Sequence, residues 1–427
     1  GIETNAVARI YSEDGFTTIT STGQNISIIG GSATGAYAQV YTVSQPLTIT
    51  ANDLTIQGNS AGASLETTSA DLTLNLSGGM TLTGGSGTNA YANIIVHTSG
   101  SLITTPTSLS LTAGDGSGSI ASIQLDDDGF SQTFSSNLTL TGSAAASAYL
   151  SVNGTVDLSA ANIILTSESP SFPAYIDNSG TEDITLTTTN NLSLTSSYIQ
   201  NDVGAITINS SNNITLDSTS YIKNLGNEGL SLTAGGNINL SGSYLQNTNG
   251  QILLIADKNI SLTSSSYILN SGSGTTLVVD NENPSSPATG ANSFTLDSSS
   301  YITTTGELRI YTSEFPYNII KGTLNGTSFT GTLNTQDANN IYDVYYSGGV
   351  YNSPYTVYYK SASNFVAENP EQITPTMELF HAINTYIDDP YYYLIWNQLF
   401  YIEFSNKLPN QEKLFFYSSF PTKPSTN

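Results

Sequence analysis

Apolar residues along most of this chain alternate with polar residues in short runs, and they do not recur at helical spacing until near the end. Between residues 184 and 270, three such runs recur in every repeat of about 23 residues, separated by Ser, Gly and Asn. Alternation with period 2 predicts β-strands, and a fixed repeat of this length predicts a stacked repeat architecture. One run in each repeat opens with a tyrosine. These tyrosines are Tyr198, Tyr221, Tyr244 and Tyr267.

The same pattern extends toward the N-terminus with longer turns, such as the glycine-rich segment 84–87. It predicts about eleven coils of three strands and three turns, which at ~4.8 Å per strand make a rod of roughly 50–55 Å. The fold class expected for residues 1–310 is therefore an all-β, right-handed parallel β-helix. The residues predicted to mark the second strand of successive coils are Ile26, Leu54, Met80, Leu109, Leu138, Ile163, Leu192, Ile214, Ile238, Ile260 and Phe294.

Period 2 also predicts which side chains face the interior. In residues 36–40 the small and apolar set is Ala36, Ala38 and Val40, so Tyr37 and Gln39 are expected to point outward. Aligning the Tyr198 strand on this pattern places its tyrosine outside and the following aliphatic residue inside. The residues predicted to be inside are Ile199, Ile222, Leu245, Ile268 and Ile302.

An asparagine follows three residues after each of five tyrosines. Because asparagine tolerates the left-handed backbone conformation, we expect it at a turn, passing amide hydrogen bonds to the asparagines of the coils above and below. These residues are Asn178, Asn201, Asn224, Asn247 and Asn270.

The strongly acidic net charge of the chain excludes one class of partner. Only 10% of residues are charged, and 33 acidic residues against 9 Lys and Arg give a net charge of −24. Phosphate binding needs clustered Lys and Arg, so nucleic acid is excluded as a partner. There is no cysteine and no run of 18 apolar residues, so neither a disulfide framework nor a membrane span is expected. The chain does not begin with Met, and we expect a secreted product at the cell surface or outside the cell.

Two phrases carry a family resemblance. Residues 234–240, Ala-Gly-Gly-Asn-Ile-Asn-Leu, and residues 256–262, Ala-Asp-Lys-Asn-Ile-Ser-Leu, resemble the repeats of filamentous-haemagglutinin-type large exoproteins of bacteria. The resemblance covers roughly residues 20–310. It implies a β-helix exported to the bacterial surface with a structural or adhesive role. The secretion domain that such proteins usually carry is not recognisable, so the resemblance does not imply their export route.

The composition changes after the repeats. Residues 311–360 are expected to form terminal coils or a tyrosine-rich strand region, with a possible hairpin around Ser347–Gly349. Helical spacing of apolar residues from Met377 to Ile387, and again after Pro390, predicts two helices in residues 361–427. This segment is expected to cap the last coil, to act as an assembly module, or both. The aromatic residues assigned to assembly are Tyr391, Tyr392, Trp396 and Phe400.

Few residues offer catalytic or metal-binding chemistry. His97 and His381 are the only histidines, and without cysteine a zinc site or a histidine-based nucleophile is not expected. His97 is interpreted as a residue at a strand end. The one dense carboxylate cluster is Asp126, Asp127 and Asp128, which is either a solvated turn closed by Gly129, a calcium site, or an acid/base pair for glycoside cleavage.

A row of outward tyrosines is the best candidate contact surface. Such a row could bind a glycan or a partner protein, or its members could stack on one another and stiffen one face. The tyrosines are Tyr37, Tyr91, Tyr149, Tyr175, Tyr198, Tyr221, Tyr244, Tyr267 and Tyr301.

The function expected from these features is that of a secreted bacterial surface rod with a structural or adhesive role. Its expected partner is either itself, in a homo-oligomer or fibre, or a host or neighbouring cell surface. A polysaccharide-cleaving β-helix enzyme is the alternative. A lyase is disfavoured because residues 10–222 contain no Lys or Arg, whereas a hydrolase needs only two carboxylates.

Overall fold

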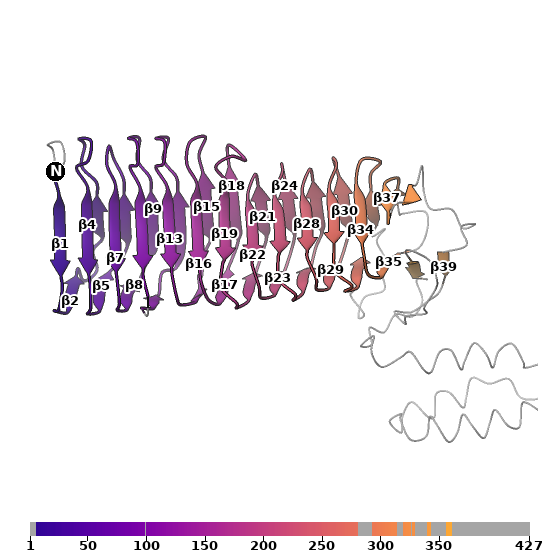
Figure 1. The fold of residues 1–427 in the computed structure, drawn as a ribbon, viewed down its shortest axis with the longest axis horizontal. Helices are drawn as coiled ribbons and strands as arrows, with labels where there is room; N and C mark the ends of the chain where they lie inside the picture. The colour runs from indigo at the N-terminus through magenta and orange to yellow at the C-terminus, as the bar shows by residue number, and fades with distance from the viewer. Residues whose placement is uncertain are drawn as a thin grey trace, which may run out of the picture. The chain divides into compact units, whose positions relative to one another are not determined.

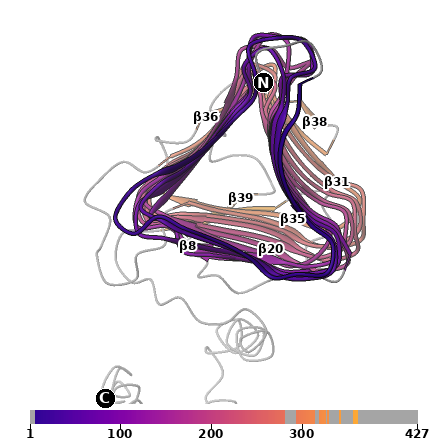
Figure 2. The same cartoon turned by 90° about the vertical axis from the view of Figure 1, so that its left-hand side faces the viewer.

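The computed structural model describes residues 6–98, 100–280, 293–313, 319–325, 327–328, 340–342 and 356–360, and in these residues it contains strands and no helix. The strands form a parallel β-solenoid of about eleven turns (Figure 1). Seen along its axis, the solenoid has three sides that meet at three corners (Figure 2). The all-β, parallel part of the expectation is confirmed.

One side carries the tyrosines and is called the tyrosine side. Its strands pair in parallel and in register, apart from the antiparallel pair β37–β38 at its end. In order along the sheet they are β1 (Ala8–Ser12), β4 (Ala38–Thr42), β7 (Ala63–Thr67), β10 (Ala92–Val96), β13 (Ala121–Leu125), β16 (Ala148–Val152), β19 (Ala174–Asn178), β22 (Tyr198–Asn201), β25 (Tyr221–Asn224), β28 (Tyr244–Asn247), β31 (Tyr267–Asn270), β34 (Tyr301–Thr304), β37 (Thr323–Leu324) and β38 (Thr327–Ser328).

A second side is an unbroken sheet of twelve strands. All eleven residues predicted to mark these strands stand in one column, from Ile26 to Phe294, so the spacing read from the sequence is confirmed. The strands are β3 (Ile26–Ile29), β6 (Leu54–Gln57), β9 (Gly79–Thr83), β12 (Ser108–Thr112), β15 (Leu138–Gly142), β18 (Ile163–Ser167), β21 (Leu192–Thr195), β24 (Ile214–Asp217), β27 (Ile238–Ser241), β30 (Ile260–Thr263), β33 (Phe294–Leu296) and β36 (Ile319–Ile320).

The third side is divided into two sheets and is called the split side. The first contains β2 (Thr17–Thr20), β5 (Leu47–Ala51), β8 (Leu72–Leu76) and β11 (Leu102–Thr104). The second contains β14 (Phe130–Thr133), β17 (Val156–Ala160), β20 (Ile184–Thr188), β23 (Ile206–Ser210), β26 (Leu230–Ala234), β29 (Ile252–Ala256), β32 (Thr276–Asp280), β35 (Leu308–Ser313), β40 (Thr356–Lys360) and β39 (Asn340–Tyr342). The break between β11 and β14 coincides with two buried phenylalanines, Phe130 and Phe134, that enter the core there.

Aliphatic side chains from all three sides fill the interior. The five residues predicted to be inside, Ile199, Ile222, Leu245, Ile268 and Ile302, are fully buried and pair directly from coil to coil. Burying such a side chain stabilises the fold by about 1.5–3 kcal/mol. The core is therefore a continuous column along the whole solenoid.

Glycine is required where turns of adjacent coils approach closely. In the predicted glycine-rich turn between β9 and β10, a Cβ on Gly85 would lie 2.1 Å from the carbonyl oxygen of Asn59. One coil further on, a Cβ on Gly114 would lie 2.0 Å from the carbonyl oxygen of Gly85. Any larger residue would force these turns apart, which explains why the wide N-terminal coils have glycine-rich corners.

The five asparagines after the tyrosines form a buried row, but their bonding differs from the prediction. None of them has a positive φ, and they do not bond to each other. Each instead donates its amide to a carbonyl oxygen of the turn that follows, as Asn224 does to Glu228 at 3.0 Å, and its own oxygen accepts a backbone N–H such as that of Gly226 at 2.9 Å. These hydrogen bonds are needed because the asparagines are fully buried, and a buried amide without partners would destabilise the fold.

A different row of asparagines forms the predicted amide ladder. Each member stands immediately before a strand of the twelve-stranded side, and its Nδ2 donates to Oδ1 of the previous asparagine at 2.9–3.4 Å. The ladder contains Asn137, Asn162, Asn191, Asn213, Asn237 and Asn259. Polar residues thus tie successive coils together at two corners.

β39 and β40 pair in parallel, and β40 also pairs in parallel with β35. Residues 343–355, which would contain the hairpin considered around Ser347–Gly349, lie outside the described residues, so that hairpin stays a prediction. Residues 361–427 lie outside the described residues. The two predicted helices, the cap and the four assembly aromatics therefore stay predictions.

Candidate functional site

Seven tyrosines form an uninterrupted stack on the outside of the tyrosine side. Their ring centroids are 4.7–5.0 Å apart and neighbouring ring planes differ by 1–10°. The in-register parallel strands produce this geometry, because they repeat each outward side chain at the strand spacing of about 4.7–4.9 Å. The stack contains Tyr149, Tyr175, Tyr198, Tyr221, Tyr244, Tyr267 and Tyr301.

Tyr37 and Tyr91 do not belong to this stack. The residue in the Tyr149 column is Gln39 on β4 and Asn93 on β10, which places Tyr37 and Tyr91 two positions earlier along their strands. The space over Gly62 is filled by the ring of Tyr91. Both tyrosines face outward as predicted, but a shift of two residues preserves facing and changes the column.

Stacking determines which part of each tyrosine is open to a ligand. The rings from Tyr175 to Tyr267 have a neighbour on both faces and are half-buried, while the terminal Tyr301 is 36% exposed. A sugar ring binds an aromatic ring through its face. Within the stack, only the hydroxyl edges and the two end faces are open to a partner.

Burial changes the acid–base chemistry of this surface. It raises the pKa of Tyr175 and Tyr198 above the ordinary range, and with the neighbouring phenols it raises the pKa of Tyr244 to about 12. Burial and the charge of Asp202 raise the pKa of Asp177 to about 6. Asp177 stands two residues after Tyr175 on the same outward face, so the stack has an acid beside it that titrates close to neutral pH.

A second group of side chains surrounds His97, directly after β10. Its Nδ1 lies 2.7 Å from Asp126 Oδ2 and its Nε2 lies 3.2 Å from Glu66 Oε1. Gln39 donates to the other oxygen of Glu66 at 2.8 Å. Burial by itself would lower the pKa of His97, but the hydrogen bonds and charges of Asp126 and Glu66 raise it above its ordinary value. His97, predicted as a strand-end residue, therefore connects Glu66 on the preceding coil to Asp126 on the following coil.

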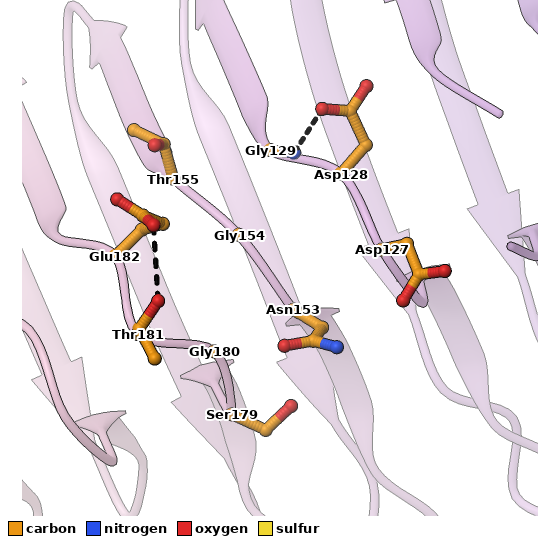
Figure 3. A pocket seen from close by; sticks show the side chains of 10 residues that line it. All are labelled: Asp127, Asp128, Gly129, Asn153, Gly154, Thr155, Ser179, Gly180, Thr181 and Glu182. Carbon is orange, nitrogen blue, oxygen red and sulfur yellow. Dashed lines mark hydrogen bonds between the residues drawn. The ribbon is translucent and has the colours of Figure 1, made fainter. Parts of the chain in front are cut away.

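The three consecutive aspartates do not act together. Asp126 turns to His97, Asp128 accepts the N–H of Gly129 at 2.8 Å, and Asp127 and Asp128 line an open pocket (Figure 3). In the described part of the chain, no group of three or more His, Asp or Glu could hold a metal ion. The geometry thus gives no support to a calcium site at Asp126–Asp128.

The pocket of about 350 Å³ lies where the tyrosine side turns into the split side. Three successive turns line it, residues 127–129, 153–155 and 179–182, and Figure 3 shows Asp127, Asp128 and Glu182 around it. Glu182 was not singled out from the sequence. Only coil stacking brings it to the same pocket as a turn more than fifty positions earlier in the chain.

The fold and these surfaces define the chain as a parallel β-solenoid with a stacked tyrosine face. No protein-family model, no curated protein and no solved structure matches it. The likeness of its repeat phrases to the haemagglutinin-type exoproteins therefore stays a prediction. No helix of the described residues is long and apolar enough to span a membrane.

Proposed function

We propose that this chain is a structural or adhesive rod on the surface of a bacterium, built as a right-handed solenoid. The observation that carries the proposal is the unbroken tyrosine stack, which continues over seven coils of one side. Stacked rings stiffen that side and present a regular row of hydroxyl edges to a partner. Parallel strands joined by crossovers are right-handed in about 98% of cases, which supports the handedness.

Composition and repeat phrases support the surface location. A net charge of −24 keeps rods soluble and mutually repelling. The repeat phrases resemble those of exported bacterial exoproteins. An elongated solenoid of about eleven turns places its distal coils far from any point of attachment.

Electron microscopy and cell binding test this proposal together. Purified protein should appear as rods and should bind bacterial or host cells in a saturable way. Tyr198→Ala and Tyr244→Ala should weaken binding, whereas Thr207→Ala on the split side should not. Binding that is unchanged by all three substitutions would refute an adhesive role for the tyrosine side, and globular particles would refute the rod.

A polysaccharide hydrolase is the second candidate, because the pocket gathers three carboxylates. Asp127 and Asp128 line the pocket from one turn and Glu182 from another, and glycoside cleavage needs two carboxyl groups on either side of the bond. We expect no release of reducing ends from acidic or neutral polysaccharides, with or without Ca²⁺. Cleavage that disappears in Asp127→Asn or Glu182→Gln would establish the enzyme instead.

We also propose that the rods associate through residues 341–427 and the N-terminal coil. That coil exposes apolar side chains, with Ile10 49%, Phe16 78% and Ile29 49% exposed. Burial of apolar surface would drive association, so it should strengthen as salt screens the acidic repulsion. Light scattering of the full chain and of a chain lacking residues 361–427, across salt concentrations, tests this. A monomeric full-length chain under all conditions would rule the association out.

A further inference from the structure

The tyrosine stack places oxidisable phenols in direct contact. A phenol that loses one electron and one proton becomes a radical whose spin lies on the oxygen and on the ring carbons ortho to it. Two such radicals that meet form a carbon–carbon bond. The controlling factor is therefore whether two phenols are held close together with their ortho carbons facing.

The solenoid provides this arrangement repeatedly. Tyr175 pairs in register with Tyr198, and Tyr198 with Tyr221. Their centroids are 4.7 and 4.8 Å apart, and the ring planes differ by 3° and 2°. Because in-register strands repeat each ring by one coil step, the ortho carbons of one ring are next to the equivalent carbons of the following ring.

The phenols are also accessible and unengaged. The rings are half-buried with their edges outward, and in the described part of the chain the hydroxyls of Tyr175, Tyr198 and Tyr221 make no hydrogen bond. At the end of the stack, by contrast, the Tyr149 hydroxyl accepts a bond from Gln124 Nε2 at 3.1 Å. Asp177 follows Tyr175 by two residues on the same outward face, and its charge raises the pKa of the phenols of Tyr175, Tyr198 and Tyr221.

We propose that the tyrosine stack is a modification site, at which a peroxide-driven peroxidase couples neighbouring tyrosines of successive coils into dityrosine. Each coupling removes one electron and one proton from each of two phenols and forms one ortho–ortho carbon–carbon bond. Hydrogen peroxide takes up the two electrons and two protons and becomes two molecules of water. The product is a covalent link between coils, which strengthens the solenoid whether or not the rod is adhesive.

Full-length protein treated with a haem peroxidase and hydrogen peroxide tests the proposal. A protease that cleaves before aspartate separates the tyrosines, since residues 157–176 contain only Tyr175, residues 183–201 only Tyr198, and residues 217–256 Tyr221 and Tyr244. Mass spectrometry should find 157–176 joined to 183–201, and 183–201 joined to 217–256, each pair lighter by two hydrogen atoms. The protein should remain a single chain on a denaturing gel and gain dityrosine fluorescence.

Substitution of one phenol provides the matched comparison. Tyr198→Phe keeps the ring and the stack but removes the phenol, so both links of 183–201 should disappear while the link from 217–256 to 257–279 remains. The control is Tyr41→Phe, which removes a phenol from the Tyr11–Tyr41 pair, whose centroids are 5.7 Å apart and whose planes are tilted by 32°. That variant should keep all links of the stack.

Three results would overturn the proposal. These are the absence of both predicted peptide pairs, coupling only between chains or only within residues 341–427, and equal yields of the pairs from protein unfolded in urea. Circular dichroism of Tyr198→Phe before oxidation separates loss of the phenol from loss of the fold.

Discussion

Each inward residue of this solenoid lies above and below the same position of two other coils. Ile222, for example, lies between Ile199 and Leu245 of the neighbouring coils and is fully buried. The adjacent residue Lys223 points outward on the same strand. Within one strand, the inward residues are therefore expected to contribute more to stability than the outward residues between them.

Truncation of the core should cost much more than truncation of the surface. Ile222→Ala is expected to lower the free energy of unfolding by about 2–5 kcal/mol. Ile222→Asp should cost more, because it buries an unpaired charge. Urea denaturation followed by circular dichroism measures the loss. Lys223→Ala is the control and should change stability by no more than about 0.5 kcal/mol; equal losses at 222 and 223 would contradict the facing.

The buried asparagines should contribute through their hydrogen bonds. Asn224→Ala leaves the N–H of Gly226 without its acceptor and removes one of the two amide donors to the Glu228 carbonyl, so we expect a loss of about 1–3 kcal/mol. Asn209→Ala, at an exposed position, serves as the control in the same denaturation experiment. A near-neutral Asn224→Ala would mean that water replaces the lost bonds.

Asp177 should make stability depend on pH. Its pKa is raised from 3.8 to about 6 on folding, so the folded state binds the proton more tightly than the unfolded state. The destabilisation that comes from ionising Asp177 in the folded state is absent below pH 3.8, grows up to about pH 6 and is complete above it. Asp177→Asn should therefore raise the melting temperature at pH 8 and have little effect at pH 3. A gain of the same size at both pH values, or a gain of equal size in the exposed control Asp157→Asn, would contradict this assignment.

At the scale of the elements, strands that pair in parallel and in register place one outward tyrosine of each coil directly beside the next, so the tyrosines form a continuous stack. A ring inside the stack has two stacked neighbours, and a ring at the end has one. Aromatic pairs contribute about 0.5–1.5 kcal/mol each beyond their buried area. The stack is therefore expected to stabilise its middle coils more than its ends.

Removing an inner ring should cost more than removing the last one. Tyr221→Ala loses two stacked pairs, whereas Tyr301→Ala loses one, so its loss of unfolding free energy should be roughly twice as large. Urea denaturation measures both losses, and near-ultraviolet circular dichroism reports the stack itself. Equal losses in the two variants would contradict a stabilising contribution from the second stacked neighbour.

At the scale of the whole solenoid, each coil contacts only its neighbours, so stability should vary along the axis. The first coil exposes Ile10, Phe16 and Ile29, while the coils from β20 to β30 have fully buried columns. Amide hydrogen exchange with mass spectrometry should find slow exchange in residues 184–263 and faster exchange in residues 8–29. Uniform exchange would indicate that the solenoid opens as one cooperative unit.

Periodicity by itself determined the strands, the three-sided coils and their approximate number. It also determined which residues face inward, because side chains alternate between the two faces of a strand. Ile222 is inside for this reason and Tyr221 is outside, and both follow from local order in the sequence. The column of eleven inward residues from Ile26 to Phe294 on the twelve-stranded side followed from spacing in the same way.

Only the tertiary structure showed which side chains of different coils lie next to each other, because that depends on the register between coils of unequal length. A shift of two residues leaves facing unchanged, so the sequence could not separate Tyr37 and Tyr91 from the stacked column that begins at Tyr149. Asn224 bonds to the turn after it and Asn213 bonds to Asn191, and only the course of the backbone at each corner distinguishes these two roles. Glu182 and Asp127 line the same pocket because coils stack, and no local pattern in the sequence encodes that arrangement.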